Sequence, residues 1–506
     1  MVDDPGIHTK EGVFLTHEDY NRLVALEQLN REQGIEIVYL RQELAQLKRM
    51  IFGSKSERFV QQAPGQLSLE LDIAPVEAPP AETEEITYTR QKSKGQGKES
   101  PVRLPLPSHL HREVILIEPE EDVSGAKKIG EVITEILEYT PGKFYVEQYV
   151  RPKYALPEDK GIVIGDLPSF PIPRGNAGAG LLSHIVISKF TDHLPFYRQV
   201  QQFKRQDIII AESTLNGWFS ATCKLLYPLY DKLVEKVKMS NYLMADETPI
   251  PVLTSEKPGS THKGFHWVYY SLPKKLVCFD YQKGRGRDGP LKFLEQYQGT
   301  LQTDGYVAYK EFENRKNITL LACMAHARRK FDQAKDNDPE RANYVLEKIQ
   351  DLYDIERNSR EQGLSSDARK ELRQKESLPI LSVLEDWMKK QLPEVLPQSS
   401  IGKALTYTLG LWDRLLRYID DGRYEIDNNL IENSIRPVAL GRKNYLFVGS
   451  HEGAKRAAMM YSFLGTCKIN GVEPFSWLRD VLNRIQDYPV NKIEELLPGY
   501  QPEKSE

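Results

Sequence analysis

The sequence predicts a multidomain α/β protein with one mixed catalytic core and several helical parts. The chain has 506 residues, and a typical domain has about 100 to 200, so we expect several domains. Runs rich in β-branched and aromatic residues gather in the middle of the chain, and charged, helix-favouring stretches lie on both sides of them. A heptad pattern near the N-terminus adds a coiled coil to this plan.

Composition indicates a soluble protein. The chain is 40% hydrophobic and 28% charged, and no apolar run approaches the roughly 20 residues that span a bilayer. The start, MVDDPGIHTKEGVF, lacks the basic and apolar regions of a secretory signal, so we expect a cytoplasmic protein without a membrane partner. Four scattered cysteines favour a reducing compartment and no disulfide frame. The net charge of −4 neither demands nor excludes nucleic acid.

The first hundred residues predict a helix followed by a linker. Heptads between Leu23 and Ile51 favour a coiled coil over residues 16–59 and a homodimer, and the alternative is an amphipathic helix packed on its own chain. Residues 60–100 combine an acidic, proline-containing half with a basic half, a composition that cannot bury a core, so we expect a disordered linker.

Two smaller regions precede the core. Short β-prone runs separated by Pro and Gly predict a β-rich module over residues 101–177. Residues 178–240 turn helical, with Glu212 to Thr214 as a predicted helix cap, and resemble a helix-turn-helix that binds DNA. A plain helical connector remains the alternative. The predicted phosphate contacts in this region are the basic residues Lys189, Arg198, Lys204 and Arg205.

The core is predicted over residues 241–335. Three strand-like runs (241–253, 264–272 and 275–282), a helix at 290–297 and a fourth strand at 300–304 follow the order of a ribonuclease-H-like core, and a fifth strand and a helix come next. Residues 336–420 lack strand signals and predict an α-helical insertion. The last part of the core is expected at 421–456, with Asp427 and Asn428 capping a helix, and a C-terminal helical segment at 457–506.

Three carboxylates fall at informative places in this plan. Asp246 and Asp304 each end a strand-like run, and Glu432 lies in the late helix. Hard oxygen ligands of this kind suit a pair of divalent cations, Mg²⁺ or Mn²⁺, that act on phosphodiesters. The alternative is that each Asp caps a turn at a strand end, which Gly305 after Asp304 makes plausible.

Basic groups accompany the carboxylates and predict DNA contact. The late helix carries Arg436 one turn after Glu432, and the fifth strand leads into His326. The alternatives are a solvated basic face and a strand-end His bonded to backbone. The further residues predicted to hold DNA are Arg328, Arg329, Arg442 and Lys443.

Several long motifs also resemble a known family. LLSHIVISKFTDHLPFYRQ, ADETPIPVL, LQTDGYVAYK, AHARRKF and DGRYEIDNNLIENSIRPVALGRKNYLFVGSHEGAKRAA occur in the order seen in the large transposase of the insertion sequence 66 family. The resemblance runs from about residue 20 to residue 485. It implies a DDE-type transposase with Asp246, Asp304 and Glu432 as the catalytic triad and metal ligands, and with DNA as its partner.

The chain departs from the family pattern at two places. The family has a cysteine-paired zinc module before the helical region, whereas residues 101–177 contain no cysteine, so zinc is not expected. The family has Arg directly after the triad Glu, and this chain has Asn433.

The resulting hypothesis is two-metal cutting at the ends of an insertion sequence, followed by joining of the 3′-hydroxyl ends to target DNA by in-line displacement. The alternatives are a structure-selective nuclease on the same core and a non-catalytic DNA-binding remnant that acts in regulation. The expected setting is the bacterial nucleoid, with a homodimer or higher assembly on DNA and helper proteins from the same element as further partners.

Overall fold

The computed structural model describes residues 7–8, 14–26, 29, 33, 142, 144–150, 153–155, 162–164, 168–173, 175–254 and 259–502. The predicted linker, the heptads beyond residue 33 and most of the β-rich module lie outside these residues. The chain divides into two compact units, of which residues 56–167 form one. In this unit β3 (Lys153–Ala155) pairs antiparallel with β4 (Ile162–Ile164). Near the N-terminus β1 (Ile7–His8) pairs with β2 (Phe14–Leu15), and residues 17–26 are helical.

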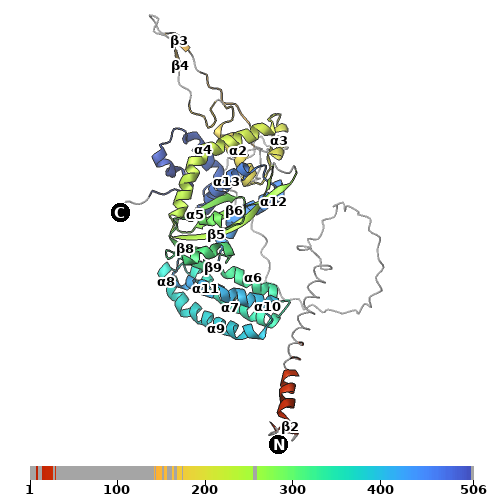
Figure 1. The fold of residues 1–506 in the computed structure, drawn as a ribbon. Helices are drawn as coiled ribbons and strands as arrows, with labels where there is room; N and C mark the ends of the chain where they lie inside the picture. The colour runs from red at the N-terminus through yellow and green to blue at the C-terminus, as the bar shows by residue number, and fades with distance from the viewer. Residues whose placement is uncertain are drawn as a thin grey trace, which may run out of the picture. The chain divides into compact units, whose positions relative to one another are not determined.

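The larger unit is built on a five-stranded mixed sheet with the strand order β7-β6-β5-β8-β9 (Figure 1). Its strands are β5 (Tyr242–Leu253), β6 (Thr261–Ser271), β7 (Leu276–Gln282), β8 (Gly299–Thr303) and β9 (Ile318–Ala322). The first three are antiparallel neighbours, and β8 and β9 continue the sheet in parallel to β5. The predicted strands and the mixed α/β class are confirmed. The helix between β7 and β8 is shorter than predicted, because α5 ends at Phe293 (Asp288–Phe293).

Helices cover the sheet and protect its edge. The edge strand β7 receives two side chains of α13 (His451–Ile469): the Phe279 amide donates to Ser462 Oγ at 2.8 Å, and the Val277 amide donates to Thr466 Oγ1 at 3.2 Å. These bonds satisfy backbone groups that an exposed edge would offer to another chain. The boundary predicted between residues 456 and 457 falls inside α13, so the core continues into the C-terminal segment. That segment adds α14 (Pro474–Arg484) and η5 (Val490–Leu496).

The helical region before the sheet comprises α2 (Ala179–Phe190), α3 (Phe196–Lys204) and α4 (Glu212–Lys238). Helix α4 begins at Glu212 with Ala211 at its N-cap position, and no side chain caps it. The predicted cap at Glu212 to Thr214 is therefore wrong by one turn, since these residues already have helical backbone. The apolar side chains of α2 and α4 pack into the same hydrophobic core as the sheet.

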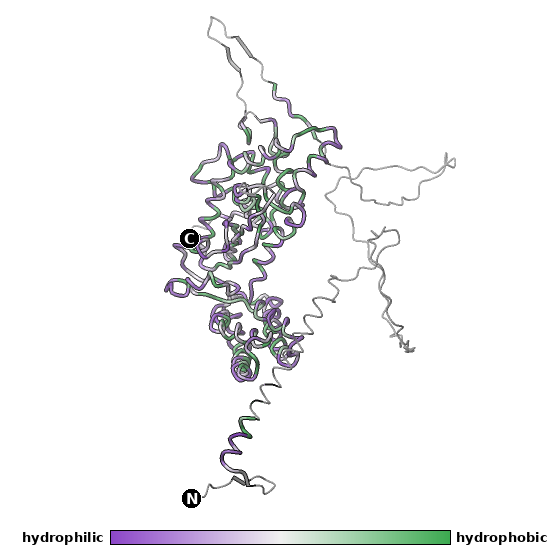
Figure 2. Tube along the Cα trace, turned by 45° about the vertical axis from the view of Figure 1, so that its right-hand side comes forward, coloured by the Kyte–Doolittle hydropathy of each residue, from purple (hydrophilic) through white to green (hydrophobic). Residues whose placement is uncertain are grey.

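The helical insertion forms a second, separate apolar core (Figure 2). After α6 (Met324–Ala334) the chain folds into α7 (Pro339–Glu361), α8 (Ser366–Leu372), a single π turn η2 (Arg373–Ser377), α9 (Leu378–Gln391), η3 (Leu392–Glu394), α10 (Ser400–Gly410), α11 (Trp412–Leu416) and η4 (Arg417–Asp420). Figure 2 shows hydrophobic and hydrophilic stretches alternating along these helices, as expected for amphipathic helices around a shared core. None of the helices that the structure describes is long and apolar enough to cross a membrane.

The chain then returns to the sheet through α12 (Asn429–Tyr445). Helix α12 packs on β5 and β6. After it, the Val448 amide donates to the Pro251 carbonyl, and the Leu253 amide donates to the Val448 carbonyl, each at 2.8 Å. The edge of β5 is therefore paired with β8 at one end and with this returning segment at the other. Between them it faces α12.

Candidate active site

Two carboxylates lie side by side on neighbouring strands. Asp304 directly follows β8, as predicted, whereas the prediction that Asp246 ends its strand is wrong, because β5 continues for seven residues beyond it. Strands β5 and β8 run parallel, with Met244 opposite Gln302, so continuing this register by two residues brings Asp246 beside Asp304. Strand β8 ends at Thr303, whereas β5 continues to Leu253. The ladder between the two strands therefore ends just before the acidic pair.

Asp246 is in a setting that disfavours its charge. Its Oδ1 accepts a hydrogen bond of 2.8 Å from the Glu247 amide. Burial raises the pKa of Asp246 to about 8, and three nearby carboxylates add to the rise. These belong to Glu247, Asp304 and Glu432. Because like charges this close repel one another, the group favours a proton or a cation.

Asp304 makes the turn contact that the sequence offered as an alternative. Its Oδ1 accepts a hydrogen bond of 2.8 Å from the Tyr306 amide, across a turn in which Gly305 has a φ of +85°. This is the turn-capping interaction of a strand-end Asp. The Asp304 carbonyl also accepts a 2.5 Å hydrogen bond from the Tyr407 hydroxyl of α10. The helical insertion thus contacts the strand end directly.

Glu432 comes from the first turn of α12. The Asp427 side chain accepts a 2.9 Å hydrogen bond from the Asn429 amide, which starts the helix, whereas Asn428 occupies the cap position without a side-chain bond. On the side of α6, His326 Nε2 lies 3.9 Å from Glu432 Oε1 and Arg329 Nη2 lies 3.5 Å from it. Two predicted phosphate-binding groups are therefore adjacent to the predicted triad Glu.

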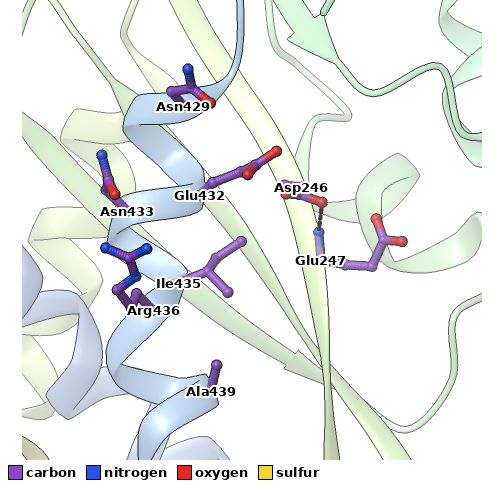
Figure 3. Close-up of a pocket in the computed structure, with 8 residues that line it drawn as sticks. All are labelled: Asp246, Glu247, Asn429, Glu432, Asn433, Ile435, Arg436 and Ala439. Carbon is purple, nitrogen blue, oxygen red and sulfur yellow. Dashed lines mark hydrogen bonds between the residues drawn. The ribbon is translucent and has the colours of Figure 1, made fainter. Parts of the chain in front are cut away.

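A pocket of about 500 Å³ separates α12 from β5. In Figure 3 the Glu432 carboxylate extends from α12 toward Asp246 on β5. Arg436 lines the same pocket one helical turn further along, and its side chain is exposed. The remaining lining residues are Glu247, Asn429, Asn433, Ile435 and Ala439. Among the residues that the structure describes, no three His, Cys, Asp or Glu side chains lie close enough to hold a metal ion without movement.

Burial and charge also act on His326. Burial lowers the pKa of His326 below its usual value, and Asp304 opposes that decrease. The ring is therefore neutral at neutral pH and can donate one hydrogen bond.

Two of the predicted DNA contacts have partners inside the protein. The Lys189 ammonium lies 4.2 Å from the centre of the Phe196 ring and 4.9 Å from that of Tyr445, and burial lowers its pKa to about 8. The Arg442 guanidinium donates to Thr248 Oγ1 at 2.9 Å and to the Pro249 carbonyl. Lys189 thus packs α2 against α12, and Arg442 bonds α12 to β5. The basic residues in the sequence did not show by themselves which cations have partners inside the protein and which are exposed.

The other basic residues are exposed. Arg198 donates a 3.3 Å hydrogen bond to Asn444 Oδ1, which links α3 to the end of α12. The remaining exposed members of the predicted set are Lys204, Arg205, Arg328 and Lys443.

Sequence reasoning missed two residues of this region. Glu247 follows Asp246, and its side chain is only 3% exposed. It pairs with Arg285, whose Nε lies 2.6 Å from Glu247 Oε1. Glu247 could have been found from the sequence, because it is a carboxylate directly after the predicted metal ligand Asp246. Nothing in the local sequence indicates that Arg285 lies beside Glu247.

Comparison with known proteins gives a consistent picture over most of the chain. Residues 174–456 match the family model described as "Transposase IS66 family", and residues 462–498 match "IS66 C-terminal element". Residues 39–115 match "Transposase C of IS166 homeodomain". Residues 123–156 match "zinc-finger binding domain of transposase IS66" although they contain no cysteine. This last match speaks against the expectation that zinc has no role.

Similar curated proteins occur in Sinorhizobium fredii. The uncharacterized protein y4jD is 34% identical over 505 residues, which cover 96% of this chain and 97% of that protein. The uncharacterized protein y4hP is 32% identical, over 91% of this chain and 88% of its own length. The uncharacterized protein y4qI is 35% identical, over 80% and 79% respectively.

Proposed function

The chain belongs to the IS66 family of transposases, and from this premise we propose that it cuts DNA at the ends of an insertion sequence and joins the 3′-hydroxyl ends to target DNA. The observation that carries the proposal is that Asp246 on β5 and Glu432 on α12 line one pocket, while Asp304, directly after β8, acts on the charge of Asp246 from the neighbouring strand. The proposed core is ribonuclease-H-like. An antiparallel group of three strands followed by two parallel strands, with one acid within β5 and one directly after β8, supports it.

The residues present fit divalent cations. The cluster offers hard carboxylate oxygens. Burial first, and then the neighbouring carboxylates, raise the pKa of Asp246, and a bound cation would stabilise its charged form. Asp246, Asp304 and Glu432 would hold Mg²⁺ or Mn²⁺ after their side chains close on it. When bound, such ions activate a water or hydroxyl nucleophile and stabilise the leaving oxygen.

The protein's own groups position the DNA around this cluster. Neutral His326 and charged Arg329 lie beside Glu432, where both can donate to oxygens of a phosphodiester. Arg436 adds a positive charge inside the pocket. The strand that is cut is thus held between α6 and α12. No covalent bond to the protein is required, because the reaction depends on orientation and charge neutralisation.

DNA is the proposed partner outside the pocket as well. Exposed Lys204 and Arg205 end α3, and exposed Arg198 joins α3 to α12, so these cations can contact the phosphate backbone. We extend the proposal to a homodimer or higher assembly on DNA.

Cleavage of a duplex that carries the terminal sequences flanking the gene tests the proposal. We expect Mg²⁺-dependent nicking by the full chain, and a decrease of roughly 10³-fold or more in Asp246→Asn or Glu432→Gln, with unchanged DNA binding. Glu452→Gln is the matched control, because that exposed carboxylate pairs with Lys455 on the surface of α13. Undiminished cutting by either triad variant would refute the assignment.

Precut ends with free 3′-hydroxyls separate the alternatives. A transposase joins them to target DNA, whereas a structure-selective nuclease cuts but does not join. A non-catalytic remnant binds the ends and does neither in the presence of Mg²⁺ or Mn²⁺.

A further inference from the structure

Beyond the end of the β5/β8 ladder, another contact must hold Asp246 on β5 and Asp304 after β8 together. The last paired residues are Met244 and Gln302, and the acids lie two positions further along. No ladder hydrogen bond fixes their separation, although metal ligands need a defined spacing.

Arg285 makes that contact on the side of β5. It lies in the loop between β7 and α5, and its Nε donates to Glu247 Oε1 at 2.6 Å. Glu247 is the residue directly after Asp246, and its amide donates to Asp246 Oδ1 at 2.8 Å. The second Glu247 oxygen has no hydrogen-bond partner among the residues that the structure describes. Arg285 is therefore the cation that fixes this buried carboxylate.

The same guanidinium makes a contact on the side of β8. It lies 4.0 Å from the centre of the Tyr306 ring, and the Tyr306 hydroxyl donates to the Arg285 carbonyl at 3.1 Å. The Tyr306 amide in turn donates to Asp304 Oδ1 at 2.8 Å. Arg285 thus contacts one neighbour of each acid, by an ion pair on one side and by ring stacking on the other.

We propose that Arg285 is a positioning residue that holds the middle of β5 and the segment after β8 at a fixed spacing, so that Asp246 and Asp304 together bind a divalent cation. This inference rests on the proposed function of the same site. Arg285 acts through Glu247 and Tyr306 and does not touch the scissile DNA. Because its pair with Glu247 also neutralises one carboxylate of the cluster, its loss leaves the acids both less ordered and more repulsive.

The same loop offers a matched control. Arg287 is two residues away, its side chain is 62% exposed, and it pairs with Glu311, which is 41% exposed. An exposed pair of this kind contributes little to stability, and the carboxylates of the site are not involved in it.

The test measures metal binding by the full chain without DNA. Mn²⁺ is titrated into wild type, Arg285→Gln, Arg285→Lys and Arg287→Ala, and free Mn²⁺ is followed by electron paramagnetic resonance. We expect Arg285→Gln to weaken Mn²⁺ binding by roughly 10- to 100-fold, as is typical when a residue that orients metal ligands is lost. Arg285→Lys keeps the charge but not the planar stacking surface, so it should restore binding in part. Arg287→Ala should bind Mn²⁺ as wild type does.

A second measurement separates positioning from general damage. Cutting of the end-bearing duplex is followed against Mg²⁺ concentration, and we expect the half-saturating concentration to rise in Arg285→Gln while much of the rate returns at saturating Mg²⁺. Melting temperatures of the four proteins report folding. If Arg285→Gln unfolds, the Mn²⁺ titration of Arg285→Lys decides whether Arg285 has the positioning role.

Two outcomes overturn the inference at different levels. If wild type binds Mn²⁺ and cuts DNA while both folded Arg285 variants bind Mn²⁺ equally well, the positioning role is wrong and the proposed function stands. If wild type neither binds Mn²⁺ nor cuts the duplex, the proposed function fails and this inference fails with it.

Discussion

The buried Arg373 offers a sharp test of how the helical insertion is held together. Its side chain is fully buried at the start of the π turn, and all five of its N–H groups have acceptors. The Glu356 carboxylate accepts from Nε at 2.7 Å and from Nη2 at 2.9 Å. The other acceptors are the carbonyls of Tyr418, Asp421 and Tyr424, at 2.7 to 2.9 Å.

Replacing Arg373 by Met removes one partner of a buried ion pair and leaves three carbonyls without their donor. Loss of one partner of a buried pair costs about 3 to 5 kcal/mol. Glu356 retains Arg369, whose Nη2 lies 2.6 Å from Glu356 Oε2, and this keeps the cost from rising further. We therefore expect Arg373→Met to lower the stability of the insertion by about 3 to 5 kcal/mol.

Amide hydrogen exchange is the suitable assay, because a chain of several units does not unfold in one step. At about 1.4 kcal/mol for each tenfold change, the amides of α7 and of residues 418–425 should exchange at least roughly 100-fold faster in Arg373→Met. Arg357→Met is the matched control on α7, the helix of Glu356. Arg357 is 56% exposed and pairs with Asp354, so its effect should stay below about 1 kcal/mol. Equal protection in wild type and Arg373→Met would refute the reasoning.

Three further predictions follow from the charges of the larger unit. Burial lowers the pKa of His266 to about 3, far below the usual value of about 6.5, so the folded state keeps this ring neutral. Stability is then full above pH 6.5 and decreases by up to about 1.4 kcal/mol per pH unit as the pH falls toward 3, and His266→Phe should flatten this part of the denaturation profile. Replacing Lys204 and Arg205 together by Ala should reduce the slope of log DNA affinity against log salt concentration by about 0.9 for each lost phosphate contact, measured by fluorescence anisotropy. Arg442 bonds inside the protein, so Arg442→Ala should lower the melting temperature more than the DNA affinity. Removal of divalent metal with EDTA should abolish cutting and leave end binding intact, and added Mg²⁺ should restore cutting.

The strands of the core could be predicted because their signal is local. Residues 242–253 and 276–282 are rich in β-branched and aromatic side chains and are bounded by turn residues, and both form strands of the sheet. The position of Asp304 at a strand end followed from the same pattern, whereas the predicted strand end at Asp246 was wrong, because β5 continues to Leu253. Helix limits were less predictable. Helix α5 ends at Phe293, whose ring stacks on Tyr269 with the ring centres 3.9 Å apart, and the composition around α5 does not encode that contact.

The contacts that were missed join residues far apart in the chain. Arg285 reaches Glu247 across two strands, and the hydrogen bond from Tyr407 to Asp304 spans the insertion. A single sequence shows which residues are charged or aromatic but not which of them meet. The same limit applies to Lys189 and Arg442, whose basic side chains turn toward aromatic rings and a strand backbone.

The insertion also bears on the position of Glu432, although it interrupts the core between β9 and α12. Arg373 binds the carbonyl of Tyr424, and the hydroxyl of that tyrosine lies 2.7 Å from Thr300 Oγ1 on β8. The next residue, Glu425, accepts at its carbonyl from Gln302 Nε2 at 2.9 Å and donates its amide to the Tyr242 hydroxyl at 3.0 Å.

The segment that leads into α12 is thus bonded to the insertion on one side and to β5 and β8 on the other. Because Glu432 lies only a few residues beyond it, loosening this segment should displace Glu432 relative to Asp246 and Asp304. If Glu432 serves as the proposed third carboxylate, the insertion supports its position, and we expect damage to the buried ion pairs of the insertion to reduce cutting.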